Sequence, residues 1–401
     1  MDRRDHQNRQ NMDFNLTTTD EEENFRVKLG AFLDRELTPQ ICRQHSMDLG
    51  LGPEARAFAL KLGATGWLGR GWPEKYGGSG GSVIDEYILV QEFARHEAFV
   101  PNIVARFMCG PVMLRHGSEE MKEKFLPRIA AGEIEFSLGY TEPSSGSDLA
   151  SMRMRAVDDG DSYIITGQKI FNTQSHFADY HWLAVRTNPD VPRHHGISLF
   201  VVDQRAEGIT IRPIETLGGE RTNEVFYDSV RVPKSRLVGG LNKGFYYMAE
   251  ALGYERLMLF QAIRLVPPFK RLVAYTKSTM RGGRLLCDNP DVRRHLAQMA
   301  TEIKIAQALE DRAFALLKKG NPLDHESSLL KLFASSMRQR FVDAALDIMG
   351  PAGRLEEDSA EAPLAGEIIK MARASVIDTI GGGTSEILKS LVATRGMGLP
   401  R

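Results

Sequence analysis

The spacing of hydrophobic residues changes twice along the 401-residue chain. Between residues 18 and 135, apolar positions recur every three or four residues, which predicts helices. Between residues 136 and 240 the apolar runs are short and separated by turn residues, which predicts the strands of a small barrel or sandwich. From residue 241 to 401 long helical runs return, with the lengths of an antiparallel bundle. The pattern therefore predicts an α+β chain of three domains in the order helical, β and helical.

Three local patterns add detail to this outline. Residues 1–17 contain no hydrophobic segment, and we interpret them as a disordered leader. In the β region, MRMRAV and SYIITGQK flank DDGD, which predicts a β-hairpin. In the last region, Phe245–Arg281 has the pattern of one long helical run.

Composition and charge exclude several classes of partner. The chain has 51 Lys and Arg against 52 Asp and Glu, so its net charge is -1. A chain balanced in this way has no basic surface for nucleic acid or for an anionic membrane. Its three cysteines form no CxxC motif, and the sequence shows neither a signal segment nor an apolar run of about 18 residues. We therefore expect a cytoplasmic protein with no membrane span and no metal site.

The segment YTEPSSGSD, residues 140–148, lies where the first helical region meets the first strand. It is dense in hydroxyl and backbone N–H groups, and Gly146 permits a ligand to approach the backbone closely. Turns of this kind bind phosphates and polarised heterocycles. The alternative is a serine-rich connection that binds no ligand, and the residues alone leave that alternative open.

Two further segments are candidates for ligand binding. In GQKIFNT, Phe171 is suited to stack on a flat ring, although a core position in the barrel is the simpler interpretation. In IGGGTSEI, three glycines precede a helix whose predicted N-cap is Thr384, an arrangement suited to anion binding. The alternative for this segment is a flexible linker between helices.

Six segments resemble the acyl-CoA dehydrogenase family in their order and spacing: YTEPSSGSD, ITGQKIFNT, ADYHWLAVRT, GISLFVVD, NEVFYDSVRVP and IGGGTSEI. The resemblance extends over nearly all of the chain after the leader. It implies an N-terminal helical domain, a middle β-barrel and a C-terminal four-helix bundle, with FAD held between barrel and bundle. It also implies an acyl-CoA or acyl-carrier thioester as substrate, an electron-transferring flavoprotein as acceptor, and a homotetramer or homodimer.

The resemblance also implies which residues contact FAD. Backbone groups of Tyr140 and the hydroxyl of Thr141 correspond to contacts with the isoalloxazine ring. Phe171 stands where the family usually has Trp beside the flavin. The full set of contacts that these motifs imply is Tyr140, Thr141, Gly146, Ser147, Phe171, Thr173, Thr384 and Glu386.

Two segments depart from the family pattern at the contact between subunits. The family's Arg, followed three residues later by Phe-Gly, corresponds to residues 279–283, where the Phe is missing and Arg281 is displaced. A Gln of a later helix is replaced by Asp347, shortly before Gly350. Arg281 and Gly350 are therefore the candidates that remain for a contact with a neighbouring subunit's FAD.

The reaction of the family needs a carboxylate. A proton leaves the α-carbon of the thioester while hydride leaves the β-carbon, so a base must face the substrate opposite the flavin. Many relatives carry this Glu directly before the Gly-Thr of the last motif, where this chain has Gly382. A minority branch carries it in an ER-containing segment of the first bundle helix, which Glu255 in YERL matches.

Glu255 is also distinguished by its surroundings, because it shares a helical stripe with apolar residues. A carboxylate in such a place must find a partner or have its pKa raised. The structural alternative is a buried ion pair with Arg264 or Arg373. With the resemblance, we predict that Glu255 is the base. The implied substrate contacts are Ser147, Tyr254, Arg256 and Gly382.

Two other functions are consistent with parts of the sequence. A flavin monooxygenase of the same fold would need no carboxylate at either position, so Glu255 argues against it. A catalytically silent subunit that lends FAD contacts to an active partner would fit the altered segment at residues 279–283.

Overall fold

The computed structural model describes residues 16–47, 52–259, 261–321, 323 and 325–400. The predicted leader lies outside the described residues except for its last two positions. Leu16 packs against the N-terminal hydrophobic core, and the backbone oxygen of Thr17 accepts a hydrogen bond from Lys318 at 2.9 Å. These two residues are therefore part of the folded protein.

The N-terminal region is helical, as its hydrophobic spacing predicted. The helix α5, Val83–Arg95, is the most buried of its helices and begins at a capping box formed by Ser82 and Asp85. The ring of Tyr87 stacks on Phe314 of the C-terminal region at 3.9 Å. The other helices are α2 (Asp20–Glu36), α3 (Pro39–Met47), α4 (Pro53–Gly63), α6 (Gly110–His116) and α7 (Glu119–Ala130).

The middle region forms a curled seven-stranded sheet. The predicted hairpin is confirmed, because β2 and β3 are antiparallel and Asp159 pairs with Ser162 across the turn. The sheet continues in the order β1-β4-β2-β3-β7-β6, and β5 pairs with β4. The strands are β1 (Phe136–Gly139), β2 (Arg155–Asp159), β3 (Ser162–Lys169), β4 (Tyr180–Arg186), β5 (Ile197–Asp203), β6 (Ile209–Glu215) and β7 (Arg221–Pro233).

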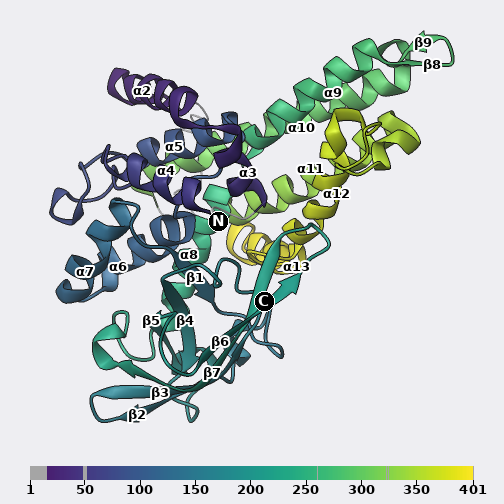
Figure 1. The fold of residues 1–401 in the computed structure, drawn as a ribbon. Coiled ribbons are helices and arrows are strands. Elements are labelled where there is room, and N and C mark those ends of the chain that lie inside the picture. Colours follow the sequence, from purple (N-terminus) through teal and green to yellow (C-terminus); the bar gives the residue numbers. More distant parts are fainter. Residues whose placement is uncertain (1–15, 48–51, 260, 322, 324, 401) are drawn as a thin grey trace.

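The C-terminal region consists of long helices that extend away from the sheet (Figure 1). A short hairpin of β8 and β9 lies at their far tip (Figure 1). The helices are α8 (Gly244–Leu259), α9 (Val266–Ser278), α10 (Pro290–Lys318), α11 (Glu326–Met349), α12 (Glu367–Ser375) and α13 (Ser385–Leu391), and the hairpin strands are Met280–Arg281 and Arg284–Leu285.

The single helical run predicted at Phe245–Arg281 is wrong, because the structure divides it into α8 and α9. Gln261 has extended backbone angles, φ -91° and ψ 131°, and a 3-10 turn at Ala262–Leu265 follows it. Pro267 and Pro268 lie in the first turn of α9, where proline is tolerated, and they lack the N–H groups that would continue α8.

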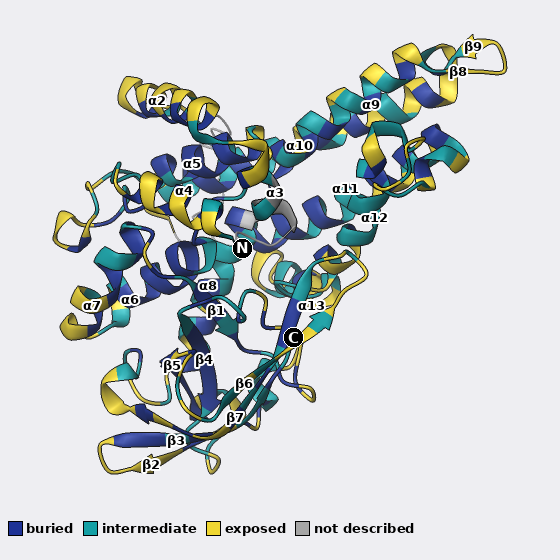
Figure 2. Cartoon of the chain, viewed as in Figure 1, coloured by how far each residue is buried: buried dark blue, intermediate teal, exposed yellow. Residues whose placement is uncertain are grey.

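The three regions assemble in the predicted order and confirm the fold class (Figure 1). Figure 2 shows that buried residues run through the helices of both ends and through the inner strands. Of the helices in the described ranges, none is both long and apolar enough to cross a membrane.

Candidate active site

A cavity of about 1470 Å³ lies where the three regions meet. The N-terminal region contributes Phe99 and Phe107 to its wall, and the sheet contributes Leu138 and Thr222. Residues on the first bundle helix and on the glycine-rich loop before α13 line it as well. Most residues predicted to contact cofactor or substrate line this cavity: Tyr140, Thr141, Gly146, Ser147, Phe171, Thr173, Glu255, Arg256, Gly382 and Thr384.

The turn at residues 140–148 is held by a buried ion pair that the sequence reasoning missed. Lys169, at the end of β3, has no exposed side-chain surface and donates to Glu142 at 2.9 Å and to the backbone oxygen of Tyr140 at 3.0 Å. The second carboxylate oxygen of Glu142 accepts from the backbone N–H of Arg153. A signal for this pair was available in SYIITGQK, where side chains alternate between the two faces of the strand. This alternation places Lys169 on the buried face.

Phe171 is not a core residue of the barrel, so that interpretation is wrong. Its side chain is 61% exposed and lines the cavity, and its φ of 59° is uncommon for a bulky residue. The next residue, Asn172, anchors this segment by donating from its side chain to the backbone oxygen of Leu138 at 2.7 Å. The hydroxyl of Thr173 contacts that of Thr222 at 3.2 Å. The ring of Phe171 is therefore presented to the cavity by a fixed backbone.

The loop before α13 is also held in place, which argues against a flexible linker. Arg256 of α8 donates from Nε to the backbone oxygen of Gly382 at 2.9 Å. Lys331 of α11 donates to the backbone oxygen of Gly383 at 2.7 Å. Gly382 has a φ of 68°, in the left-handed region that favours glycine. Thr384 caps α13 by accepting from the backbone N–H of Ile387, as predicted.

Glu255 lies on α8 and lines the same cavity as this loop. Its Oε2 atom is buried and has no hydrogen-bond partner among the residues that the structure describes. Burial raises the pKa of Glu255 from 4.5 to about 7, although the positive charges of Arg256 and Lys331 act to lower this pKa. A carboxyl with such a pKa is suited to exchange a proton near neutral pH.

The arginines of the alternative ion pair have other contacts. Arg373 pairs with Glu356. Arg264 places its guanidinium over the ring of Phe99 at 4.4 Å. In the described part of the chain, neither arginine pairs with Glu255, so the alternative of a buried ion pair loses its proposed partners.

Four predicted site residues do not line the cavity. The hydroxyl of Tyr254 accepts a hydrogen bond from Arg115 at 2.9 Å on another side of α8. Arg281 donates to the backbone oxygens of Ile348 and Met349 at 2.9 and 2.8 Å, beside Gly350 at the far end of the bundle. The fourth residue is Glu386, which is exposed on α13. Their proposed contacts with substrate or cofactor remain predictions.

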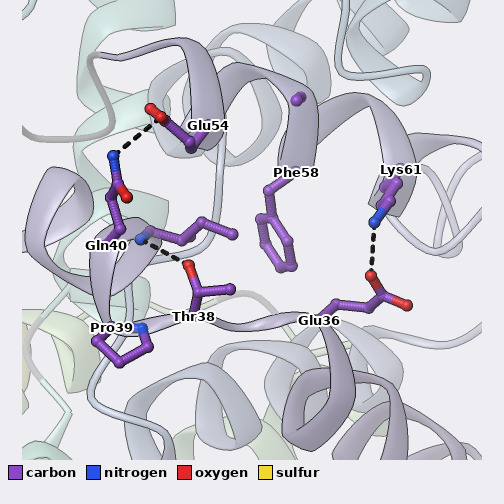
Figure 3. Close-up of a pocket in the computed structure, with 9 residues that line it drawn as sticks. Glu36, Thr38, Pro39, Gln40, Glu54, Phe58 and Lys61 are labelled. Carbon is purple, nitrogen blue, oxygen red and sulfur yellow. Dashed lines mark hydrogen bonds and ion pairs between the residues drawn. The ribbon is translucent and has the colours of Figure 1, made fainter.

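A second pocket, of about 600 Å³, lies between α3 and α4 (Figure 3). Glu36 pairs with Lys61 at 2.7 Å, and Gln40 donates to Glu54 at 2.9 Å (Figure 3). Because these polar groups satisfy one another, this pocket offers little to a ligand. Within the described ranges, no group of three or more His, Cys, Asp or Glu residues is placed to hold a metal ion.

The helical, β and helical regions share one large cavity that a carboxylate lines, which is the arrangement expected of the flavoprotein oxidoreductases that the sequence resembles. The chain belongs to the acyl-CoA dehydrogenase family. Sequence models of the family's N-terminal, middle and C-terminal domains match residues 19–133, 137–230 and 242–397. The protein is therefore an oxidoreductase that acts on acyl-CoA.

Individual relatives align over nearly the whole chain. It is 33% identical over 396 residues to acyl-CoA dehydrogenase FadE26 of Mycobacterium tuberculosis, covering 96% of this chain and 99% of the relative. A solved structure named Tcur3481-Tcur3483 steroid ACAD has a TM-score of 0.87 and 35% identity, with coverage of 96% and 99%. The ChsE4-ChsE5 complex from Mycobacterium tuberculosis has a TM-score of 0.87 and 34% identity, with the same coverage.

Proposed function

We propose that the protein catalyses FAD-dependent α,β-dehydrogenation of an acyl-CoA thioester, with Glu255 as the base. The observation that carries this proposal is the carboxylate of Glu255, which lines the shared cavity with one oxygen unpartnered among the described residues and with a raised pKa. A buried acid without a bonding partner is costly to the fold unless it has a chemical role.

The cavity has the size and chemistry that FAD requires. Its volume of about 1470 Å³ exceeds the roughly 300–1000 Å³ of a pocket for one drug-sized ligand, which suits a site shared by cofactor and substrate. Phe171 offers a ring for stacking, and Thr141 and Thr173 offer hydroxyls. A Cβ atom at Gly146 would meet no atom within 4 Å, so the backbone there is open to a ligand. When bound, FAD would supply the acceptor for the hydride that leaves the β-carbon.

The chain's own residues would position the thioester and move its α-proton. We propose that the backbone N–H of Gly382 donates to the thioester carbonyl oxygen, which makes the α-proton more acidic. Glu255 then takes that proton on its carboxylate. Arg256 and Lys331 keep Gly382 and Gly383 in place through the hydrogen bonds to their carbonyl oxygens.

The similar structures support a bulky acyl group and an oligomeric enzyme. The steroid ACAD and the ChsE4-ChsE5 complex each carry the names of two chains.

At the cavity of this protein, Val376, Ile377 and Ile380 are 48%, 53% and 55% exposed. Exposed apolar residues in such a group mark an interaction surface. We propose that a partner subunit covers this face and that an electron-transferring flavoprotein would be the electron acceptor of the enzyme.

The proposal is tested by anaerobic mixing of the FAD-loaded protein with a panel of straight, branched and polycyclic acyl-CoA thioesters. We expect at least one thioester to bleach the flavin absorbance, and we expect denaturation to release FAD and not FMN. Retention of the yellow colour with every thioester, in a preparation that retains FAD, would contradict the proposal. Oxygen-dependent oxidation of a substrate by the reduced enzyme would favour the monooxygenase instead.

A further inference from the structure

Two polar residues that follow α8, Gln261 and Arg264, form a polar corner of the cavity. The proposed dehydrogenation assigns no role to either of them. Gln261 and Arg264 both line the cavity, and Gln261 is only 4% exposed. Within the described residues, the amide oxygen and nitrogen of Gln261 have no hydrogen-bond partner. The Nε and Nη2 atoms of Arg264 have none either. Leaving a buried polar atom unpaired is costly to the fold, so four such atoms on two residues only three apart in the sequence are suited to bind a ligand.

The free atoms of Arg264 lie along one edge of its guanidinium. Its Nη1 atom donates to the backbone oxygen of Ala98 at 3.5 Å, and the ring of Phe99 covers one face of the group at 4.4 Å. The remaining edge, which carries Nε and Nη2, has no hydrogen-bond partner among the described residues. A guanidinium edge with two parallel N–H groups matches the two oxygens of a carboxylate.

In the described part of the chain, the guanidinium of Arg264 contacts a backbone oxygen and an aromatic ring but forms no ion pair. Glu310 is the acid whose charge acts on Arg264; it is fully buried, and this burial raises the pKa of Glu310 to about 8. Asp378 is paired with Arg338 at 2.9 Å. Burial lowers the pKa of Arg264 to about 10, which leaves it cationic at neutral pH. The corner therefore carries a positive charge with two nitrogens that have no hydrogen-bond partner among the described residues.

The corner and Glu255 line the same cavity. Gln261 and Arg264 follow Glu255 by six and nine residues in the sequence, beyond the end of α8. One substrate bound in this cavity can therefore contact both Glu255 and the corner.

We propose that Arg264 and Gln261 bind a carboxylate at the far end of the acyl group, so that the substrates are CoA thioesters that carry a second, free carboxylate. This inference rests on the proposed dehydrogenase function. In this arrangement Nε and Nη2 of Arg264 donate to the two carboxylate oxygens, and the amide nitrogen of Gln261 donates to one of them.

The first test compares substrates in the wild-type, FAD-loaded enzyme. CoA thioesters of dicarboxylic acids, of increasing length and including ring acids, are each paired with the matching terminal carboxamide and with a ring ketone. For at least one length, we expect kcat/KM for flavin reduction to favour the carboxylate by roughly 10- to 100-fold, the range for a charge-assisted bidentate contact. Equal or better use of the carboxamide or ketone at every length would overturn the inference.

The second test assigns this preference to the corner. Arg264→Gln and Gln261→Leu should narrow the ratio of carboxylate to carboxamide toward one, whereas Lys270→Gln, which removes an exposed positive charge on α9, should preserve it. Calorimetry with the Glu255→Gln variant should show the same preference in Kd without turnover. If folded Arg264→Gln keeps the wild-type ratio of kcat/KM between carboxylate and carboxamide, the inference is overturned. If this variant does not fold, the substrate comparison in the wild-type enzyme decides.

The two proposals fail in different ways. If no thioester of any kind reduces the flavin, the dehydrogenase function itself is wrong. If thioesters with a methyl end reduce it and no carboxylate preference exists, only the polar corner has been misassigned.

Discussion

The Glu255→Gln variant should lose dehydrogenation and gain stability in the same protein. The amide has nearly the size of the carboxyl group, but it does not accept the α-proton, a role whose loss costs about 10²- to 10⁴-fold in rate. The hydrogen bonds from Arg256 and Lys331 to the loop do not involve Glu255 and should persist. We therefore expect the variant to bind FAD and thioester without reducing the flavin.

The gain in stability follows from the pKa of Glu255. Burial raises this pKa from 4.5 to about 7, and about 1.4 kcal/mol per pH unit makes the ionised form cost the folded state about 3 kcal/mol. Between these two pH values the folded protein holds a proton that the unfolded chain has released, so wild-type stability falls as pH rises. Gln does not ionise. The variant's advantage in unfolding free energy should therefore grow from near zero at acidic pH to about 3 kcal/mol above about pH 7.

The assay is unfolding of FAD-loaded wild type and variant at about pH 5 and about pH 8, together with anaerobic flavin reduction. Glu207→Gln makes the same change at an exposed position and should give neither a gain in stability nor a loss of reduction. The reasoning is refuted if Glu255→Gln is less stable at the higher pH and still reduces the flavin normally per folded molecule. That result would indicate an ion pair with an arginine or lysine.

Four further predictions address the site and the assembly. Lys169→Met should lower the free energy of unfolding by about 3–5 kcal/mol, because Glu142 would remain buried without its partner. If the variant retains FAD as well as the wild type does, the ion pair is not needed to hold the cofactor-binding turn. The kcat/KM should rise about tenfold per pH unit up to about pH 7 and then level off, because Glu255 acts deprotonated; a flat profile would be inconsistent with it. Gly382→Ala should cost about 1–2 kcal/mol at its φ of 68° and weaken thioester binding in titrations, whereas Gly146→Ala has open space for its Cβ and should leave the melting temperature unchanged. Light scattering of the FAD-loaded protein should show an oligomer, and an active monomer would contradict the proposed partner face.

Some features depend only on residues close together in the sequence, and these were predictable. The period of hydrophobic positions distinguishes helix from strand within about a dozen residues, which explains why the three-part order and the β2–β3 hairpin are correct. The cap at Thr384 is equally local. The break between α8 and α9 was missed because the apolar spacing continues through Gln261, even though Pro267 and Pro268 signalled it.

The site itself depends on contacts between distant residues, which only the tertiary structure decides. The bond from Arg256 to Gly382 joins residues 126 apart, and the Lys169–Glu142 pair joins residues 27 apart. The same pattern of residues is compatible with an exposed or a buried Phe171, and with a paired or an unpaired Glu255. Burial and partners depend on which surfaces pack together, and those surfaces come from all three regions of the chain. The sequence by itself therefore determined the fold class and the candidate base. Packing decided the environment that raises the pKa of Glu255, and it leaves two nitrogens of Arg264 without a hydrogen-bond partner among the described residues.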